Sequence, residues 1–198
     1  MRVLKSRAML RAAMTLLVVF SAVLSLPAQS SSDSTQSAGS LIYASGSGFE
    51  VVRNGTTEEY DLTTDIVEGL EFYADDYINT FDGTFLEIQA SGTTNVLKIS
   101  ENTSFKFDRT AGSDSSQYEV TYGRVRARVR KLAGLERFAI TGPSVVAGVR
   151  GTDFGYDVLY NAEEEKMVSS VYCFEGKVEV ETTVPVVEAG AEDEIESG

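Results

Sequence analysis

From about Leu41 onward, apolar and polar residues alternate in short runs that are separated by Gly, Asn and Asp. A period of two places apolar side chains on one face of an extended strand and polar side chains on the other. No apolar stripe with helical spacing runs for more than about two turns after the first 28 residues, so the pattern predicts an all-β fold of roughly ten to fourteen short strands. Strand spacing is irregular, and no repeat of fixed period can be read. The residue pairs that each supply one strand face are Phe49/Val51, Leu70/Phe72, Leu86/Ile88, Leu97/Ile99, Phe105/Phe107, Val125/Val129, Phe138/Ile140, Tyr172/Phe174 and Val178/Val180.

The most informative segment begins as an apolar run at Val145, breaks at residues 150–152 and resumes as a strict alternation. Glycine permits positive φ and close backbone approach, so a tight corner is expected at Gly151. We expect the guanidinium of Arg150 to brace this corner by bonding backbone carbonyls or the carboxylate of Asp153 or Asp157. On this basis Gly151→Val should be severely destabilising. The residues that then share the apolar face of the following strand are Phe154, Tyr156, Val158 and Tyr160.

A second strand carries a row of arginines on one face and small apolar residues on the other. One interpretation is an anion-binding face for a polysaccharide, phosphate or carboxylate ligand. The other is a ladder of ion pairs with Asp and Glu on neighbouring strands, which is the commoner use of such rows. The arginines are Arg124, Arg126, Arg128 and Arg130.

The N-terminal region has the three-part layout of a secretory signal: a basic leader, the apolar run Ala12–Leu24 and a small residue at Ala28. The run is short for a membrane span, which needs about 20 apolar residues, so a membrane association is expected only if the signal is not cleaved. The expected organisation is a signal peptide over 1–28, a flexible Ser-rich linker over 29–45, the β domain over 46–190 and an acidic tail over 191–198. The final strand is not obvious, so we expect that the natural domain could continue in longer relatives.

Composition narrows the possible partners. The formal charge is −13, and removal of residues 1–28, which hold four basic and no acidic residues, would leave −17. Such a protein repels nucleic acid phosphates and anionic lipid head groups, so we expect no nucleic acid partner. A single cysteine, Cys173, cannot form an internal disulfide, so stability must come from one buried core.

Catalytic chemistry is sparse, and we predict that the chain is not an enzyme and holds no cofactor or metal. It contains no histidine, the commonest base near neutral pH. Cys173 lies among large apolar residues and is expected to be a small buried side chain. Asp75, Asp76 and Asp82 lie near a glycine turn, but they do not form a calcium-loop signature, and ordinary turn chemistry explains them.

Several segments together resemble the FecR domain family. The stretch from Phe138 to Phe154 is similar to the family's strand and turn leading into a Val-Arg-Gly-Thr signature, and 171–180 resembles its following Glu-Gly-x-Val hairpin. Segments 76–80 and 83–88 are similar to its earlier elements. The resemblance implies a compact, solenoid-like or sandwich-like β fold outside the cytoplasm. The signature residues it assigns are Arg150, Gly151, Thr152, Glu175 and Gly176.

The family's namesakes regulate iron-siderophore uptake through a cytoplasmic anti-sigma segment, a membrane helix and a periplasmic part. Only eleven residues precede the apolar run here, so a stand-alone exported module without the anti-sigma segment is expected. The sequence therefore predicts a periplasmic or secreted bacterial module that recognises an envelope protein or senses a signal. The alternative is a carbohydrate- or cell-wall-binding protein that uses the Arg124–Arg130 face.

Overall fold

The computed structural model describes residues 36–108, 115–131 and 136–183, and the description below concerns the compact unit that contains them. All regular structure in these residues is β, which confirms the predicted fold class. The fourteen strands are β1 (Ser37–Ser45), β2 (Gly48–Arg53), β3 (Thr56–Asp61), β4 (Glu71–Tyr73), β5 (Tyr77–Thr80), β6 (Phe85–Ala90), β7 (Val96–Ile99), β8 (Ser104–Phe107), β9 (Ser115–Arg128), β10 (Arg137–Thr141), β11 (Val145–Val149), β12 (Asp153–Asn161), β13 (Lys166–Glu175) and β14 (Val178–Thr182).

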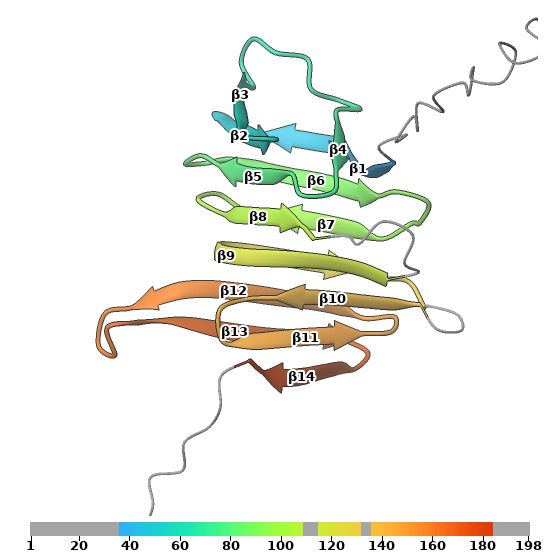
Figure 1. Ribbon diagram of the computed structural model, residues 1–198, viewed down its shortest axis with the longest axis vertical. Coiled ribbons are helices and arrows are strands. Elements are labelled where there is room, and N and C mark those ends of the chain that lie inside the picture. Colours follow the sequence, from blue (N-terminus) through green and yellow to red (C-terminus); the bar gives the residue numbers. More distant parts are fainter. Residues whose placement is uncertain (1–35, 109–114, 132–135, 184–198) are drawn as a thin grey trace, which may run out of the picture. The chain divides into compact units, whose positions relative to one another are not determined.

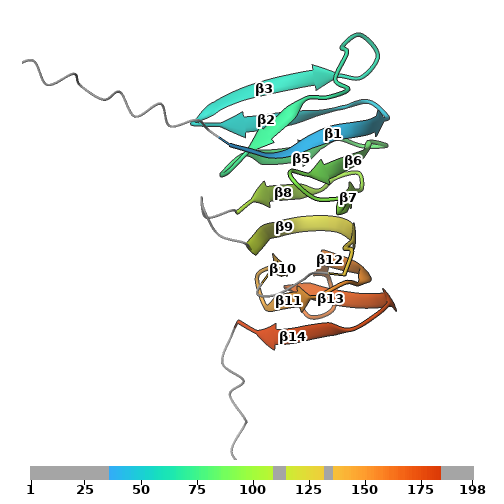
Figure 2. The ribbon, with the colours of Figure 1, turned by 90° about the vertical axis from the view of Figure 1, so that its right-hand side faces the viewer.

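The strands form two sheets that share the long strand β9. Sheet A has the order β4-β1-β6-β7-β9-β12-β13, and sheet B has the order β3-β2-β5-β8-β9-β10-β11-β14. Residues 115–122 of β9 pair in sheet B and residues 123–128 pair in sheet A, so the strand crosses from one sheet to the other. Neighbouring strands are antiparallel except for β9 and β10, and successive strands stack in layers (Figures 1 and 2).

The core lies between the two sheets and is built from the inward positions that the period-two pattern predicts. Fully buried residues come from both sheets, and a continuous series of aromatic contacts joins them. Phe138 of β10 and Phe154 of β12 meet edge to face across the two sheets, with ring centroids 6.2 Å apart. Phe72 of β4 stacks on Phe107 of β8 with centroids 5.4 Å apart. Such pairs prefer these geometries and hold the sheets at a fixed separation.

Glycines with unusual backbone angles form the corners where the chain passes between the sheets. Gly151, between β11 and β12, has a φ of +104°, and a Cβ added there would lie 2.7 Å from the Lys131 Cα. Three further corner glycines have φ between +93° and +112° and also pack against backbone of a neighbouring strand or turn: Gly46, Gly123 and Gly176. Turn glycines such as Gly83 differ, because φ there is +68° and a Cβ would meet nothing within 4 Å.

A buried threonine accompanies three of these corners and satisfies backbone groups that leave the strand ladder. Thr84 receives a hydrogen bond from the Gly48 amide and donates one to the Gly48 carbonyl, at 3.0 and 2.8 Å. Thr103 accepts from the Arg124 amide at 3.0 Å, and Thr152 donates to the Lys177 carbonyl at 2.8 Å. The corners therefore repeat a Gly–Thr arrangement although the sequence shows no repeat of fixed period.

Two predictions from the sequence are wrong in part. The expected linker 29–45 ends earlier, because 37–45 form β1, which pairs with β4 and β6 and buries Ala38 and Leu41. Cys173 is exposed, not buried. It lies opposite the buried Phe154 on β13, the edge strand of sheet A, which pairs only with β12 among the described strands. Tyr172 and Phe174 are exposed for another reason, because they lie on the outward face of sheet A on the same side as Arg126.

The predicted signal peptide and acidic tail lie outside the described residues. Within the described ranges, no helix has the length and apolar character needed to cross a membrane.

Candidate functional site

The signature residues assemble at one corner where β11, β12, β13 and β14 meet. Thr152 exchanges backbone hydrogen bonds with Val129 at 2.9 Å in both directions and is 3 % exposed. Gly176, with φ of +93°, packs so closely that an added Cβ would lie 2.8 Å from the Gly151 carbonyl oxygen. Glu175 is the last residue of β13 and lies opposite Asp153. Gly151, Thr152 and Gly176 therefore fix the crossing by backbone geometry.

Arg150 is exposed at this corner. The two carboxylates that the sequence suggested as its partners pair with arginines of β9: Asp153 with Arg126 and Arg128, and Asp157 with Arg124. The ion pairs with these carboxylates that the sequence predicted for Arg150 are thus formed by arginines of β9, and they link β9 to β12.

The row of arginines on β9 lies on the outward face of sheet A, as the alternation predicts. Arg126 binds Asp153 in a bidentate manner, with Nε–Oδ1 at 2.7 Å and Nη2–Oδ2 at 2.9 Å, and its guanidinium lies 4.4 Å from the centre of the Phe174 ring. Arg128 reaches Asp153 at 3.4 Å and Arg124 reaches Asp157 at 3.5 Å. Arg130 lies just beyond the end of β9, where its amide donates to the Asn95 side chain at 3.0 Å. Two carboxylates therefore form ion pairs with three of the four arginines.

The two carboxylates respond differently to their surroundings. The hydrogen bonds from Arg126 hold the pKa of Asp153 below its ordinary value, and Arg128 adds to this effect. Burial raises the pKa of Asp157, because the loss of hydration outweighs the attraction of Arg124. Of the two carboxylates, Asp153 is therefore the one whose charged form is stabilised, and it pairs with two of the arginines in the β9 row.

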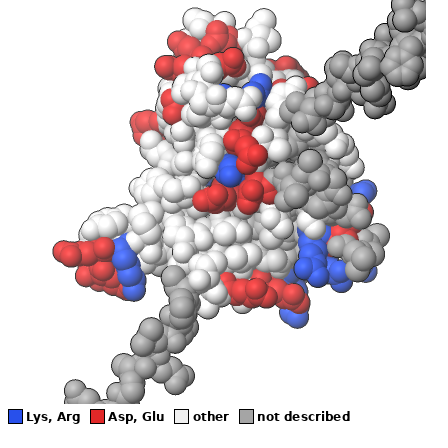
Figure 3. All heavy atoms as spheres, in the orientation of Figure 1, with Lys and Arg blue, Asp and Glu red and all other residues white. Residues whose placement is uncertain are grey.

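A groove on the outward face of sheet B lies beside the signature corner and has a volume of about 810 Å³. We call it the sheet B groove. Its lining includes Ala139 and Gly148 at the centre, three basic residues at one side and two acidic residues of β14. Figure 3 shows Lys and Arg atoms gathered where β10 begins, β11 ends and β14 begins, with Asp and Glu atoms over β14. The charged residues of the groove are Arg137, Arg150, Lys177, Glu179 and Glu181.

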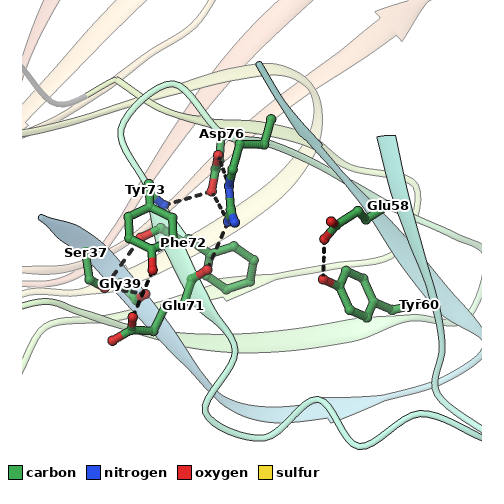
Figure 4. Close-up of polar contacts among 9 residues, drawn as sticks. Ser37, Gly39, Glu58, Tyr60, Glu71, Phe72, Tyr73 and Asp76 are labelled. Carbon is green, nitrogen blue, oxygen red and sulfur yellow. Dashed lines mark hydrogen bonds and ion pairs between the residues drawn. The ribbon is translucent and has the colours of Figure 1, made fainter. Parts of the chain in front are cut away.

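Two of the three aspartates near the glycine turn, Asp75 and Asp76, form ion pairs with basic side chains. Asp76 is 1 % exposed, and both its carboxylate oxygens bind Arg53, at 2.8 and 2.7 Å, while the Tyr73 amide donates to it at 2.8 Å (Figure 4). Asp75 pairs with Lys106 at 3.2 Å. Within the described ranges, no three His, Cys, Asp or Glu side chains are grouped in a way that could hold a metal ion.

Comparison with known proteins identifies the family. The model of the FecR protein family matches residues 76–179, which is more than half of the chain, so the chain belongs to the FecR family. No curated protein matches it. Among solved structures, it is similar to a "putative anti-sigma factor" from Parabacteroides distasonis, with 21 % identity and a TM-score of 0.44. The match covers 54 % of this chain and 47 % of that one, so the chain spans less than half of its length.

The sheet B groove could not be predicted from the sequence, because its charged residues are separated along the chain. A signal was present for the corners: Gly123 and Gly176 each stand two residues before an inward valine, at which the pairing of β9 with β7 and of β14 with β11 begins. This Gly-x-Val spacing could have located both crossings.

Proposed function

We propose that the chain is an exported, non-catalytic recognition module of the bacterial cell envelope that binds a partner protein in the sheet B groove. The groove carries this proposal, because it combines a concave surface, an open floor and charges of both signs beside the signature corner of the family. Membership of the FecR family supports a regulatory role rather than catalysis. Export rests on the predicted signal over residues 1–28.

Site-specific photo-crosslinking in the native host tests the recognition surface. A photoreactive residue at Gln117, which is exposed and lines the groove, should crosslink one partner protein. The same residue at Thr94, in the turn between β6 and β7, is the matched control and should not. Equal crosslinking from both positions, or none from Gln117, contradicts the proposal.

Export is tested separately by the mature N-terminus. Mass spectrometry of protein from the envelope or medium should show cleavage near Ala28. Recovery of the chain in the cytosol with residues 1–28 intact would contradict this part alone.

The glycan-binding alternative retains one supporting observation, which is the excess of arginine over carboxylate in the β9 ladder. It predicts retention on peptidoglycan or an anionic glycan that is lost in the Arg126→Glu/Arg128→Glu variant. An unchanged retention, or none in the native protein, removes this alternative.

A further inference from the structure

The register of sheet B places three cations in one row across neighbouring strands. Phe138 pairs with Val149, and Val149 pairs with Val178. One position beyond these pairs, Arg137 is the first residue of β10, Arg150 directly follows β11 and Lys177 directly precedes β14, and all three line the groove. Adjacent strands lie about 4.8 Å apart, so the row presents a basic wall roughly 10 Å long.

The floor of the groove is the next outward row, and its side chains are small. Ala139 pairs with Gly148, and Gly148 pairs with Glu179. A Cβ added to Gly148 would meet no atom closer than the Glu179 carbonyl oxygen at 3.9 Å, and Gly148 does not have a positive φ. The missing side chain therefore leaves space that the fold does not need, and the backbone of a ligand can approach the sheet there.

The end of the groove at β14 is acidic. Glu179 closes the floor row and Glu181 lies two residues further along the strand, and both are exposed. Lys177 and Glu179 approach to 3.6 Å, but both side chains are at least 80 % exposed, so this contact contributes little and leaves both groups open to a ligand. Basic and acidic charges therefore lie side by side at the β14 end of the groove.

We infer that the groove binds an extended segment of the partner protein in which acidic and basic residues alternate. This inference rests on the proposed function and adds the chemistry of recognition. An extended chain turns successive side chains to opposite sides, so acidic residues at i and i+2 meet the basic wall while an intervening basic residue faces Glu181. At about 3.3 Å per residue, three to four residues span the basic wall. A uniformly anionic glycan fits less well, because Glu179 and Glu181 repel it.

Synthetic peptides test the alternation directly with the full mature protein. The probe is acetyl-Ser-Glu-Lys-Glu-Lys-Ser-amide with a fluorescent label, and the control acetyl-Ser-Glu-Glu-Lys-Lys-Ser-amide has the same composition and net charge in blocks. Fluorescence anisotropy at low salt should show the alternating peptide binding about tenfold more tightly, a difference of about 1.4 kcal/mol. Raising the salt should weaken this binding, because the contacts are solvent-accessible.

Two variants locate the binding. Gly148→Leu fills the floor and should reduce binding by about tenfold or more, while thermal unfolding shows the fold intact, since the site is open. Lys177→Glu should weaken the alternating peptide by a similar factor, and the matched variant Lys166→Glu in the β12–β13 hairpin should not.

Equal binding of the two peptides, binding that survives Gly148→Leu, or preference for an anionic glycan such as polygalacturonate would each overturn this inference. Partner crosslinking from Gln117 that persists alongside any of these results would leave the proposed function standing and reject only the alternating-charge ligand.

Discussion

The corner at Gly151 offers the sharpest test of how the signature sequence acts. Gly151→Ala adds one methyl group at a φ of +104°, where L-residues are strained by about 1–2 kcal/mol. The added carbon would also lie 2.7 Å from the Lys131 Cα, which is too close for two non-bonded carbon atoms, so the backbone must shift. Forcing one carbon into a packed site typically costs about 1–3 kcal/mol.

Together the two effects predict a loss of about 2–5 kcal/mol, a large share of the roughly 5–15 kcal/mol by which domains are stable. Gly83→Ala is the matched control. It also has a positive φ, +68°, but a Cβ there meets nothing within 4 Å, so only the conformational cost of about 1–2 kcal/mol applies. The difference between the two variants isolates the close approach to Lys131.

Urea unfolding measures both values by linear extrapolation. The chain has no tryptophan and nine tyrosines, so tyrosine fluorescence and far-ultraviolet circular dichroism serve as the two probes. Equal destabilisation by Gly151→Ala and Gly83→Ala would refute the argument that the corner is set by backbone crowding. Gly151→Val, predicted to be severe from the sequence, should be at least as damaging as Gly151→Ala.

Three further predictions concern other parts of the fold. Arg53→Ala should lower the free energy of unfolding by about 3–5 kcal/mol, because it leaves the buried Asp76 carboxylate uncompensated. Asp76→Ala should lower it less, because Arg53 is 36 % exposed and can be hydrated. Equal losses in urea unfolding would contradict this asymmetry. Asp153→Asn should lose about 1 kcal/mol at neutral pH. Because the pKa of Asp153 is lowered by folding, that loss should be full above its unfolded value of 3.8 and fade as the pH falls through the lower folded value, so a loss independent of pH would reject the ion-pair explanation. Cys173 should react with a thiol reagent in the native protein at the rate of an exposed thiol, and a requirement for denaturant would show that it is covered.

Much of the β architecture follows from local alternation. The pairs Phe105/Phe107 and Phe138/Ile140 are buried as predicted, and Phe154, Tyr156 and Val158 face the core together. The pattern succeeds because the side on which a strand residue points depends only on its own backbone and the period of two.

The same pattern fails where a neighbouring strand decides the outcome. Tyr160 continues the apolar face of β12 but is 57 % exposed. Cys173 is exposed although it pairs with the buried Phe154, and it lies in an edge strand that pairs only with β12 among the described strands. Phe174 is exposed because it faces outward, where it contacts Arg126. Conversely, the Ser-rich 37–45 segment is ordered as β1 because β4 and β6 supply its hydrogen bonds.

By itself, the sequence determined the fold class, the faces of the strands and the position of the Arg150–Thr152 corner. Only the tertiary structure decided that Asp153 and Asp157 neutralise most of the β9 ladder, and that Arg137, Arg150 and Lys177 form one basic wall. The physical reason is that alternation is local, whereas register and strand order depend on how separated segments pair. One shift of register would turn these charges to the opposite face and remove the groove.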